Sequence, residues 1–152
     1  MEWETYMTQA LELARQAGAL GEIPVGAVVV KEGAVIGRGF NRRETDHDAT
    51  AHAEVLAIRE ACRTLGGWRL DGCALFVTLE PCPMCTGAIL QSRLSRVVYG
   101  AADPKAGCCG GLLALTEENF DTHPAIYAGV LERECTALLR DFFAVRRGAS
   151  RK

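Results

Sequence analysis

The side chains best suited to chemistry lie in two short segments, His52-Ala-Glu54 and Cys82-Pro-Met-Cys85. Together they offer one imidazole, one carboxylate and two thiolates. A zinc ion that activates water needs three protein ligands, an open fourth position and a nearby proton carrier. We therefore interpret His52, Cys82 and Cys85 as ligands of a catalytic Zn²⁺ and Glu54 as the catalytic proton carrier. Water activated in this way can replace an amino group on an amidine-like carbon.

The spacing within each segment sets conditions on the local structure. Cys82 and Cys85 are three residues apart at the start of an expected helix, where both sulfur atoms can face one point and thiolate is favoured. Residues two apart in a regular helix point roughly 200° apart, so His52 and Glu54 can share a site only in a loosely wound first turn. We expect this helix to begin near Thr50, capped by Asp48 or by Thr50 itself.

Other interpretations of the Cys-x-x-Cys pair remain open. The two thiols could form a redox dithiol, or a structural four-ligand zinc site could be completed by Cys108 or Cys109. The His-x-Glu segment upstream favours the catalytic site, and we interpret Cys108 and Cys109 as loop filler. Cys62, Cys73 and Cys135 lie on apolar faces and are expected in the core.

Composition indicates an ordinary globular protein. The 152 residues are 49% hydrophobic and 24% charged, which suits one domain spanning residues 1–152. No apolar run approaches the ~20 residues of a membrane helix. The acidic start differs from a signal peptide, and the seven cysteines form no spaced disulfide framework. A cytoplasmic protein with no membrane partner is expected.

The charge is unevenly distributed. The net charge is −2, which alone does not indicate nucleic-acid binding. The segment from Arg140 to Lys152, however, holds five basic residues against the single acid Asp141. This basic end could contact phosphate, or it could be a solvated helix end whose cations lie near the negative end of the helix dipole.

The apolar pattern predicts a single alternating α/β domain with no internal repeat. A hairpin joins the first two strands, and the helices between the later strands imply parallel pairing. Helix starts that follow strands can meet at the carboxyl edge of such a sheet, where ligands bind. The expected helices are Trp3–Gln16, Thr50–Leu65, Pro83–Arg93 and Leu131–Arg147, and the expected strands are Val25–Val30, Ala34–Phe40, Ala74–Leu79 and Ser95–Gly100, with a weak strand near Ile126.

Several motifs resemble those of the bacterial tRNA-specific adenosine deaminases of the cytidine deaminase-like superfamily. Thr50-Ala-His-Ala-Glu54 and Val77-Thr-Leu-Glu-Pro-Cys-Pro-Met-Cys85 carry the superfamily resemblance. Asp103-Pro-Lys-Ala-Gly107 and Asp141-Phe-Phe-Ala-Val-Arg-Arg147 point to the tRNA branch. The resemblance implies a three-layer α/β fold of the cytidine deaminase-like type, with a mixed five-stranded sheet flanked by helices. It also implies one zinc per subunit, a homodimer, and conversion of the wobble adenosine to inosine in a tRNA anticodon loop, usually that of an arginine tRNA.

The same resemblance implies roles in substrate binding. Asn41 would bind the target nucleoside, the Ala53 amide and the Pro81 carbonyl would contact the flipped base, and Asp103 would touch a neighbouring sugar. Pro24 and Val25 would form the wall of the pocket. Contacts with RNA would come from Lys105, Phe142, Phe143, Arg146 and Arg147.

Plainer interpretations stand beside these roles. Asn41 could be a turn residue after a strand, and Asp103 could be a turn acid before a proline. Adjacent aromatic residues on a helix cannot both face one way, so at least one of Phe142 and Phe143 is expected in the core. His47 and His123 are interpreted as surface hydrogen-bonding residues.

Two rival functions share parts of this pattern. A deaminase of a free base or nucleoside, such as guanine or cytosine, would use the same zinc chemistry but would have to enclose its ligand. A non-enzymatic RNA-binding module stabilised by zinc would have four protein ligands in place of three.

Overall fold

The computed structural model of the chain describes residues 2–150, with side chains up to Gly148. Arg151 and Lys152, two of the basic residues at the C-terminal end, lie outside the described residues, as does Met1. The elements in chain order are α1 (Glu2–Ala19), β1 (Gly26–Lys31), β2 (Ala34–Phe40), α2 (Ala53–Leu65), β3 (Cys73–Leu79), α3 (Pro83–Gln91), β4 (Arg96–Ala101), the 3₁₀ turn η1 (Leu115–Glu117), β5 (Ala125–Ala128) and α4 (Glu132–Ser150).

The five strands form one mixed sheet in the order β2-β1-β3-β4-β5. β1 pairs antiparallel with both β2 and β3, whereas β3, β4 and β5 are parallel. The predicted hairpin and the weak fifth strand are therefore confirmed. The first parallel pair is β3 with β4. β3 itself pairs antiparallel with β1, because it lies beside β1 and not beside β2.

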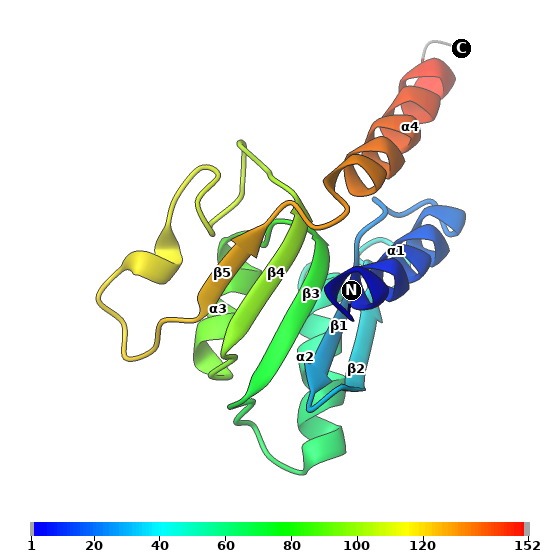
Figure 1. Cartoon of the computed structure of the whole chain (residues 1–152). Helices are drawn as coiled ribbons and strands as arrows, with labels where there is room; N and C mark the ends of the chain where they lie inside the picture. Colours follow the sequence, from blue (N-terminus) through cyan, green and yellow to red (C-terminus); the bar gives the residue numbers. More distant parts are fainter. Residues whose placement is uncertain (1, 151–152) are drawn as a thin grey trace.

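The sheet separates two helical layers, as the three-layer prediction required (Figure 1). Alternate residues of β1 show this division. Ala27 and Val29 belong to a core cluster shared with α2 and α3, while Val28 and Val30 belong to a second cluster shared with α1 and the start of α4. This alternation is the period-two pattern of a strand buried on both faces.

Helix α2 packs very closely on β2. A Cβ atom on Gly37 would collide with the Ala57 carbonyl, and one on Gly39 would collide with the Ala53 carbonyl. Only glycine allows the helix backbone to come this near to the strand. The close packing places the first residues of α2 over the sheet, and these residues carry the predicted catalytic segment.

The start of α2 differs from the expectation. The helix begins at Ala53 and not near Thr50, and His52 is its N-cap residue in extended backbone with φ −81° and ψ 153°. The Asp48 carboxylate caps a turn just before the helix, accepting hydrogen bonds from the amide and hydroxyl of Thr50 at 2.9 and 2.7 Å. The helix ends as predicted at Gly66, whose φ is 73°.

Helix α4 projects beyond the sheet (Figure 1). Cys135, Leu138 and Leu139 pack in the second core cluster, but most residues from Arg140 to Gly148 are exposed. None of the described helices has the length and apolar character needed to cross a membrane.

Candidate active site

The two chemical segments meet because of the strand directions. β2 and β3 both run antiparallel to the strand between them, so both end at the same edge of the sheet. Helix α2 follows β2 through a loop, and α3 follows β3 directly. His52 immediately precedes α2, Cys82 is the N-cap of α3, and Cys85 lies in the first turn of α3. The predicted convergence at a carboxyl edge is thus observed, across one intervening strand.

The three predicted ligands form one compact cluster. The His52 Nδ1 atom lies 3.6 Å from Cys82 Sγ and 3.4 Å from Cys85 Sγ. Tetrahedral zinc with usual bond lengths to sulfur and nitrogen would separate such atoms by about 3.6 Å. The ligand set and spacing therefore fit Zn²⁺, and a three-residue site leaves the fourth position open.

No fourth metal ligand joins this cluster within residues 2–150. The only described group of His, Cys, Asp or Glu side chains with metal-binding geometry contains these three residues. Cys108 and Cys109 are buried but lie outside that group, which counts against the structural four-ligand site. The Cys109 thiol instead lies 3.9 Å from the Thr86 hydroxyl, as expected of a packed thiol.

The titratable groups of the cluster influence one another strongly. Hydrogen bonds from Cys85 and His52 lower the pKa of Cys82 to about 4 against the opposing effect of burial. The hydrogen bond to Cys82, together with burial, raises the pKa of Cys85, and the bond to Cys82 also raises the pKa of His52. The lowered pKa favours the thiolate form of Cys82, which is the form that binds a cation.

Glu54 lies beside these groups and is almost fully buried. Burial raises the pKa of Glu54 to about 7, and the nearby Cys82 thiolate acts in the same direction. A carboxyl group whose pKa is near neutrality can both accept and donate a proton. This property suits the proton-transfer role predicted from the sequence.

These side chains open into a cavity of about 280 Å³, which suits a group the size of a nucleobase. Of the substrate-binding residues predicted from the sequence, Val25, Asn41, Ala53 and Asp103 line it. The lining residues that sequence reasoning missed are Ile23, Arg43, Leu79, Glu80 and Ala106. Glu80 is directly before Pro81-Cys82 in the sequence, but nothing local to it indicates its contacts.

Asn41 has a structural role at the rim of this cavity. Its side-chain nitrogen donates a hydrogen bond to the Ile23 carbonyl at 3.2 Å, and its side-chain oxygen accepts one from the Arg43 amide at 3.1 Å. Asn41 therefore braces the turn, as the plainer interpretation held. Each end of an amide has capacity for a second hydrogen bond, so this bracing leaves Asn41 able to bind a ligand.

Asp103 and Pro81 are also engaged within the protein. One Asp103 oxygen accepts hydrogen bonds from the amides of Lys105 and Ala106 at 3.0 and 3.2 Å, which is the turn role of an aspartate before a proline. The Pro81 carbonyl accepts a hydrogen bond from the Cys108 amide at 2.9 Å. The Thr86 hydroxyl donates a second, longer hydrogen bond to the same carbonyl at 3.4 Å, and Pro81 is absent from the cavity lining. A contact between the Pro81 carbonyl and a base would therefore have to displace the Thr86 hydroxyl.

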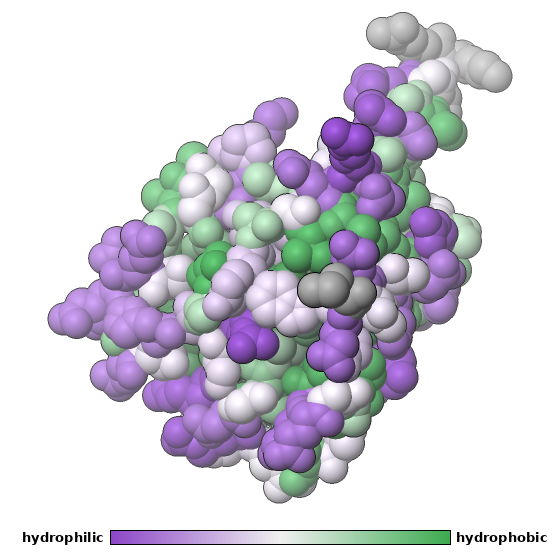
Figure 2. Space-filling view, viewed as in Figure 1, coloured by the Kyte–Doolittle hydropathy of each residue, from purple (hydrophilic) through white to green (hydrophobic). Residues whose placement is uncertain are grey.

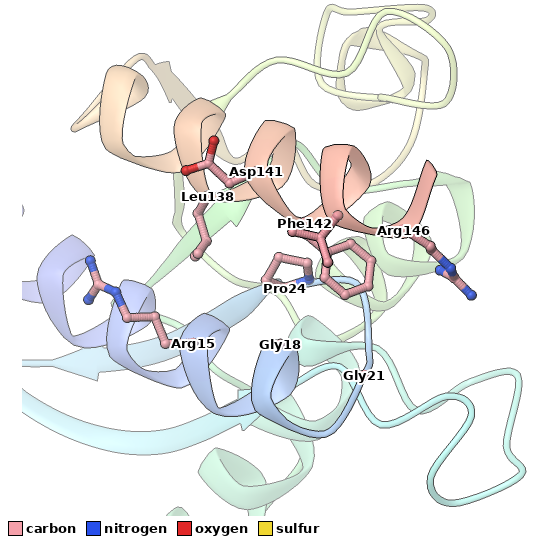
Figure 3. A pocket seen from close by; sticks show the side chains of 9 residues that line it. Arg15, Gly18, Gly21, Pro24, Leu138, Asp141, Phe142 and Arg146 are labelled. Carbon is pink, nitrogen blue, oxygen red and sulfur yellow. The ribbon is translucent and has the colours of Figure 1, made fainter. Parts of the chain in front are cut away.

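Pro24 lies away from this cavity. It lines a larger groove of about 550 Å³ between the end of α1 and α4, together with Leu138, Phe142 and Arg146 (Figure 3). Of the two predicted wall residues, Pro24 and Val25, only Val25 lines the cavity, where Ile23 joins it, and Pro24 lines the groove. Alternate residues of an extended segment face opposite sides, which explains this division.

The two phenylalanines of α4 also differ from expectation. Phe142 faces the groove and is half-buried, and Phe143 is 37% exposed. Neither belongs to a core cluster of the described residues, because α4 has passed the edge of the sheet at this point. The guanidinium of Arg146 lies over the Phe142 ring at 5.6 Å, which leaves an aromatic and cationic surface on the projecting helix.

The remaining predicted RNA contacts, Lys105 and Arg147, are exposed. Hydrophilic side chains lie along the projecting part of α4 in Figure 2, with apolar ones between them. His47 and His123 are exposed as expected, and the His123 ring lies 3.0 Å from the Thr116 carbonyl. Cys73 and Cys135 are buried as predicted, whereas Cys62 is only half-buried.

The sequence profile of the cytidine and deoxycytidylate deaminase zinc-binding region matches residues 1–101, which is more than half of the chain. The chain belongs to this family of zinc-dependent deaminases.

Comparison with individual proteins shows which members of this family the chain is similar to. A tRNA-specific adenosine deaminase of Bacillus subtilis (strain 168) is 52% identical over 141 residues, covering 92% of this chain and 88% of that protein. A structure solved in a study of A-to-I editing by tRNA:A34 deaminases at the wobble position superimposes with a TM-score of 0.84 at 45% identity, covering 89% of this chain and 99% of the other. The guanine deaminase of Bacillus subtilis is also similar, with a TM-score of 0.64 and 39% identity over 95% of this chain and 93% of the other.

Proposed function

We propose that this protein is a tRNA adenosine deaminase that converts the wobble adenosine of an anticodon loop to inosine, with an arginine tRNA as its substrate. The observation that carries the proposal is the His52, Cys82 and Cys85 cluster beside Glu54, in a cavity of about 280 Å³ that suits one base. The relatives named for tRNA adenosine deamination match nearly the whole chain. The enzyme is a hydrolase of the C–N bond of a cyclic amidine.

The protein's own residues divide the work. His52, Cys82 and Cys85 would hold zinc, which when bound would supply an activated water for hydrolysis. Glu54 moves the first proton of the water to the ring nitrogen beside the amino-bearing carbon, and the second to the leaving amine. The water oxygen bonds to that carbon, the bond from carbon to the exocyclic nitrogen breaks, and ammonia leaves. The product base then carries a carbonyl and a protonated ring nitrogen, as in inosine.

The target base must leave its stack to enter the cavity. A loop base is poorly paired, so its extrusion costs only a few kcal/mol. We assign Asn41, the Ala53 amide and Val25 to the extruded nucleoside, since all three residues line the cavity. Asp103 and Lys105 lie on the 103–107 turn at its rim, where the neighbouring nucleotide would pass.

The projecting α4 supplies a surface for the rest of the anticodon loop. Phe142 or Phe143 would stack on bases, and Arg146 and Arg147 would lie near phosphates. Phe142 is the better stacking candidate, because it faces an open groove and already lies under a guanidinium. A deaminase that encloses a free base has no need of such a surface, so its presence favours the tRNA substrate.

We also propose that the enzyme is a cytoplasmic homodimer. Large apolar side chains are exposed on the segment between β4 and β5, namely Leu112, Leu113 and Phe120. A second copy of the chain would cover this apolar segment. Light scattering of the purified protein at micromolar concentration should give twice the mass of the 16.4 kDa chain.

The decisive experiment compares two substrates. The zinc-loaded protein is incubated with transcribed arginine tRNA and, separately, with free guanine. Inosine at the wobble position is read by sequencing, and xanthine is measured by absorbance. Inosine in the tRNA with no xanthine supports the proposal. If guanine is deaminated and the tRNA is unchanged, the proposed tRNA function is wrong, and the protein acts on a free base as the similar guanine deaminase does.

A further inference from the structure

Besides Glu54, a second buried carboxyl group, that of Glu80, lines the cavity. Its side chain is 2% exposed, and it accepts three backbone hydrogen bonds from one loop. One oxygen accepts from the Asp103 amide at 2.9 Å. The other accepts from the amides of Cys109 and Gly111 at 3.0 and 2.7 Å. The Glu80 carboxylate thus draws together both ends of residues 103–111, here called the 103–111 loop.

Two glycines make this arrangement possible. A Cβ atom on Gly107 would collide with the carboxyl carbon of Glu80, and one on Gly111 would collide with a carboxylate oxygen. The loop backbone therefore wraps directly around the carboxylate, with no side chain between them. Such a concave arrangement of amides is the way in which protein backbones bind anions, and here the bound anion is the chain's own side chain.

The amides are the main compensation for a buried negative charge. No described ion pair includes Glu80. A buried carboxylate that lost its hydrogen-bond donors would be strongly destabilised, so loop and carboxylate hold each other in one geometry. The main chain adds a second tie, because the Cys108 amide donates to the Pro81 carbonyl next to Glu80 at 2.9 Å.

The anchored loop forms part of the cavity. Asp103 and Ala106 line it, and their turn is closed by the Asp103 side chain. The position of this wall is therefore set by Glu80, which itself comes two residues before the ligand Cys82. One side chain, that of Glu80, therefore connects the segment that carries the metal ligand to the loop that forms the substrate wall.

We propose that Glu80 is a positioning residue for substrate binding: it holds the 103–111 loop against the zinc-binding segment so that Asp103 and Ala106 form the wall that receives the nucleotide. Glu80 takes no part in proton transfer. The substrate used to test this rests on the proposed function, but the anchoring of the loop can be tested without any substrate.

Glu80→Gln is the first test, since glutamine keeps the size but replaces one acceptor oxygen with a donor. At least one of the three loop amides then loses its partner. Single-turnover deamination of arginine tRNA by excess protein separates the saturating rate from the half-saturating protein concentration. We expect half-saturation to rise about tenfold or more, the saturating rate to stay within about threefold, and zinc to remain at one per chain.

Hydrogen exchange gives a readout that does not depend on the reaction. In Glu80→Gln the amides of Asp103, Cys109 and Gly111 should exchange faster, while those of β3 and α3 stay protected. If the wild-type protein did not edit tRNA, this measurement would still test the anchorage, so failure of the proposed function and failure of this inference are distinguishable.

Gly107→Ala provides a second route that leaves the carboxylate intact. The added methyl group pushes the loop away from Glu80, so the same rise in half-saturation is expected without loss of zinc. The matched control is Gly67→Ala, where an added Cβ meets no atom within 4 Å. It should leave both kinetic values unchanged.

Three results would overturn the inference. The first is an unchanged half-saturating concentration in Glu80→Gln and in Gly107→Ala. The second is a loss confined to the saturating rate, which would mean that Glu80 acts on the chemical step. The third is loss of zinc from Glu80→Gln with unaltered exchange in the 103–111 loop. If Glu80→Gln does not fold, Gly107→Ala decides alone: an unchanged half-saturating concentration, or a loss confined to the saturating rate, would overturn the inference.

Discussion

His52 and Glu54 are two residues apart, yet both side chains face the same cavity. This is possible because the backbone changes from extended at His52 to helical at Ala53. In a regular helix the two side chains would point roughly 200° apart, and one of them would leave the site. The helix start is therefore what joins a metal ligand to the proton carrier.

Glu54→Gln should keep the zinc and lose the reaction. Glutamine retains the size of the side chain but cannot transfer protons, so deamination should fall by a factor of about 100 or more. Zinc content by mass spectrometry and inosine formation in tRNA check the two parts separately. Glu60→Gln, the same change on the same helix but outside the cavity, should have near wild-type activity. A Glu54→Gln protein with full zinc and normal turnover would contradict the assignment.

Cys85→Ala should lose both zinc and activity. Two remaining ligands cannot form the three-ligand site. The described metal-binding group contains no further residue that could replace the Cys85 sulfur. Metal analysis after gel filtration against a chelator is the measurement. Cys62→Ala removes a half-buried thiol elsewhere and should keep one zinc per chain. Full zinc in Cys85→Ala would show that another group completes the site.

Glu22 should stabilise the protein in a pH-dependent manner. Its buried carboxylate accepts hydrogen bonds from the amides of Glu44 and Thr45 at 3.2 and 2.6 Å, on the loop that carries Asn41. Burial alone would raise the pKa of Glu22, but the hydrogen bonds from Thr45 and Glu44 outweigh it, and the pKa lies below its usual 4.5. A lowered folded-state pKa contributes stability that is present above the unfolded-state value and is lost as the pH falls through the folded-state value.

Glu22→Gln should therefore lower the free energy of unfolding by roughly 1–2 kcal/mol at pH 7, and by progressively less below the unfolded-state pKa. Urea unfolding at pH 7 and at several acidic pH values measures the difference from wild type. Glu12→Gln, which removes an exposed ion pair with Arg15, should change the free energy by less than about 1 kcal/mol. A Glu22→Gln difference that is equal at all pH values would exclude the proposed linkage.

Gly39→Ala should damage both stability and activity. The new methyl group would collide with the Ala53 carbonyl at the start of α2, so the helix that carries Glu54 must shift. Overpacking of this kind costs about 1–3 kcal/mol. Thermal unfolding and single-turnover deamination measure the two effects. At Gly87, in the middle of α3, an added Cβ meets no atom within 4 Å, and Gly87→Ala should stabilise by up to about 1 kcal/mol.

Local sequence patterns predicted most of the elements. The β2 strand was predicted at Ala34–Phe40 and is observed there, and the glycines after Leu65 end α2 as expected. These features depend on neighbouring residues, through alternation of apolar side chains and through glycine at a positive φ. The predicted helix start at Thr50 was wrong, because Asp48 caps a turn and leaves the N-cap position to His52.

The sequence by itself determined the chemistry, because the types and spacings of His52, Glu54, Cys82 and Cys85 suit few reactions other than activation of water on zinc. Tertiary structure alone decided how these residues meet and what surrounds them. β3 lies beside β1, so two helix starts share one edge; Pro24 turns away from the cavity; and Glu80 anchors a loop more than twenty residues further along the chain. Each of these outcomes depends on contacts between distant segments, which local periodicity does not contain.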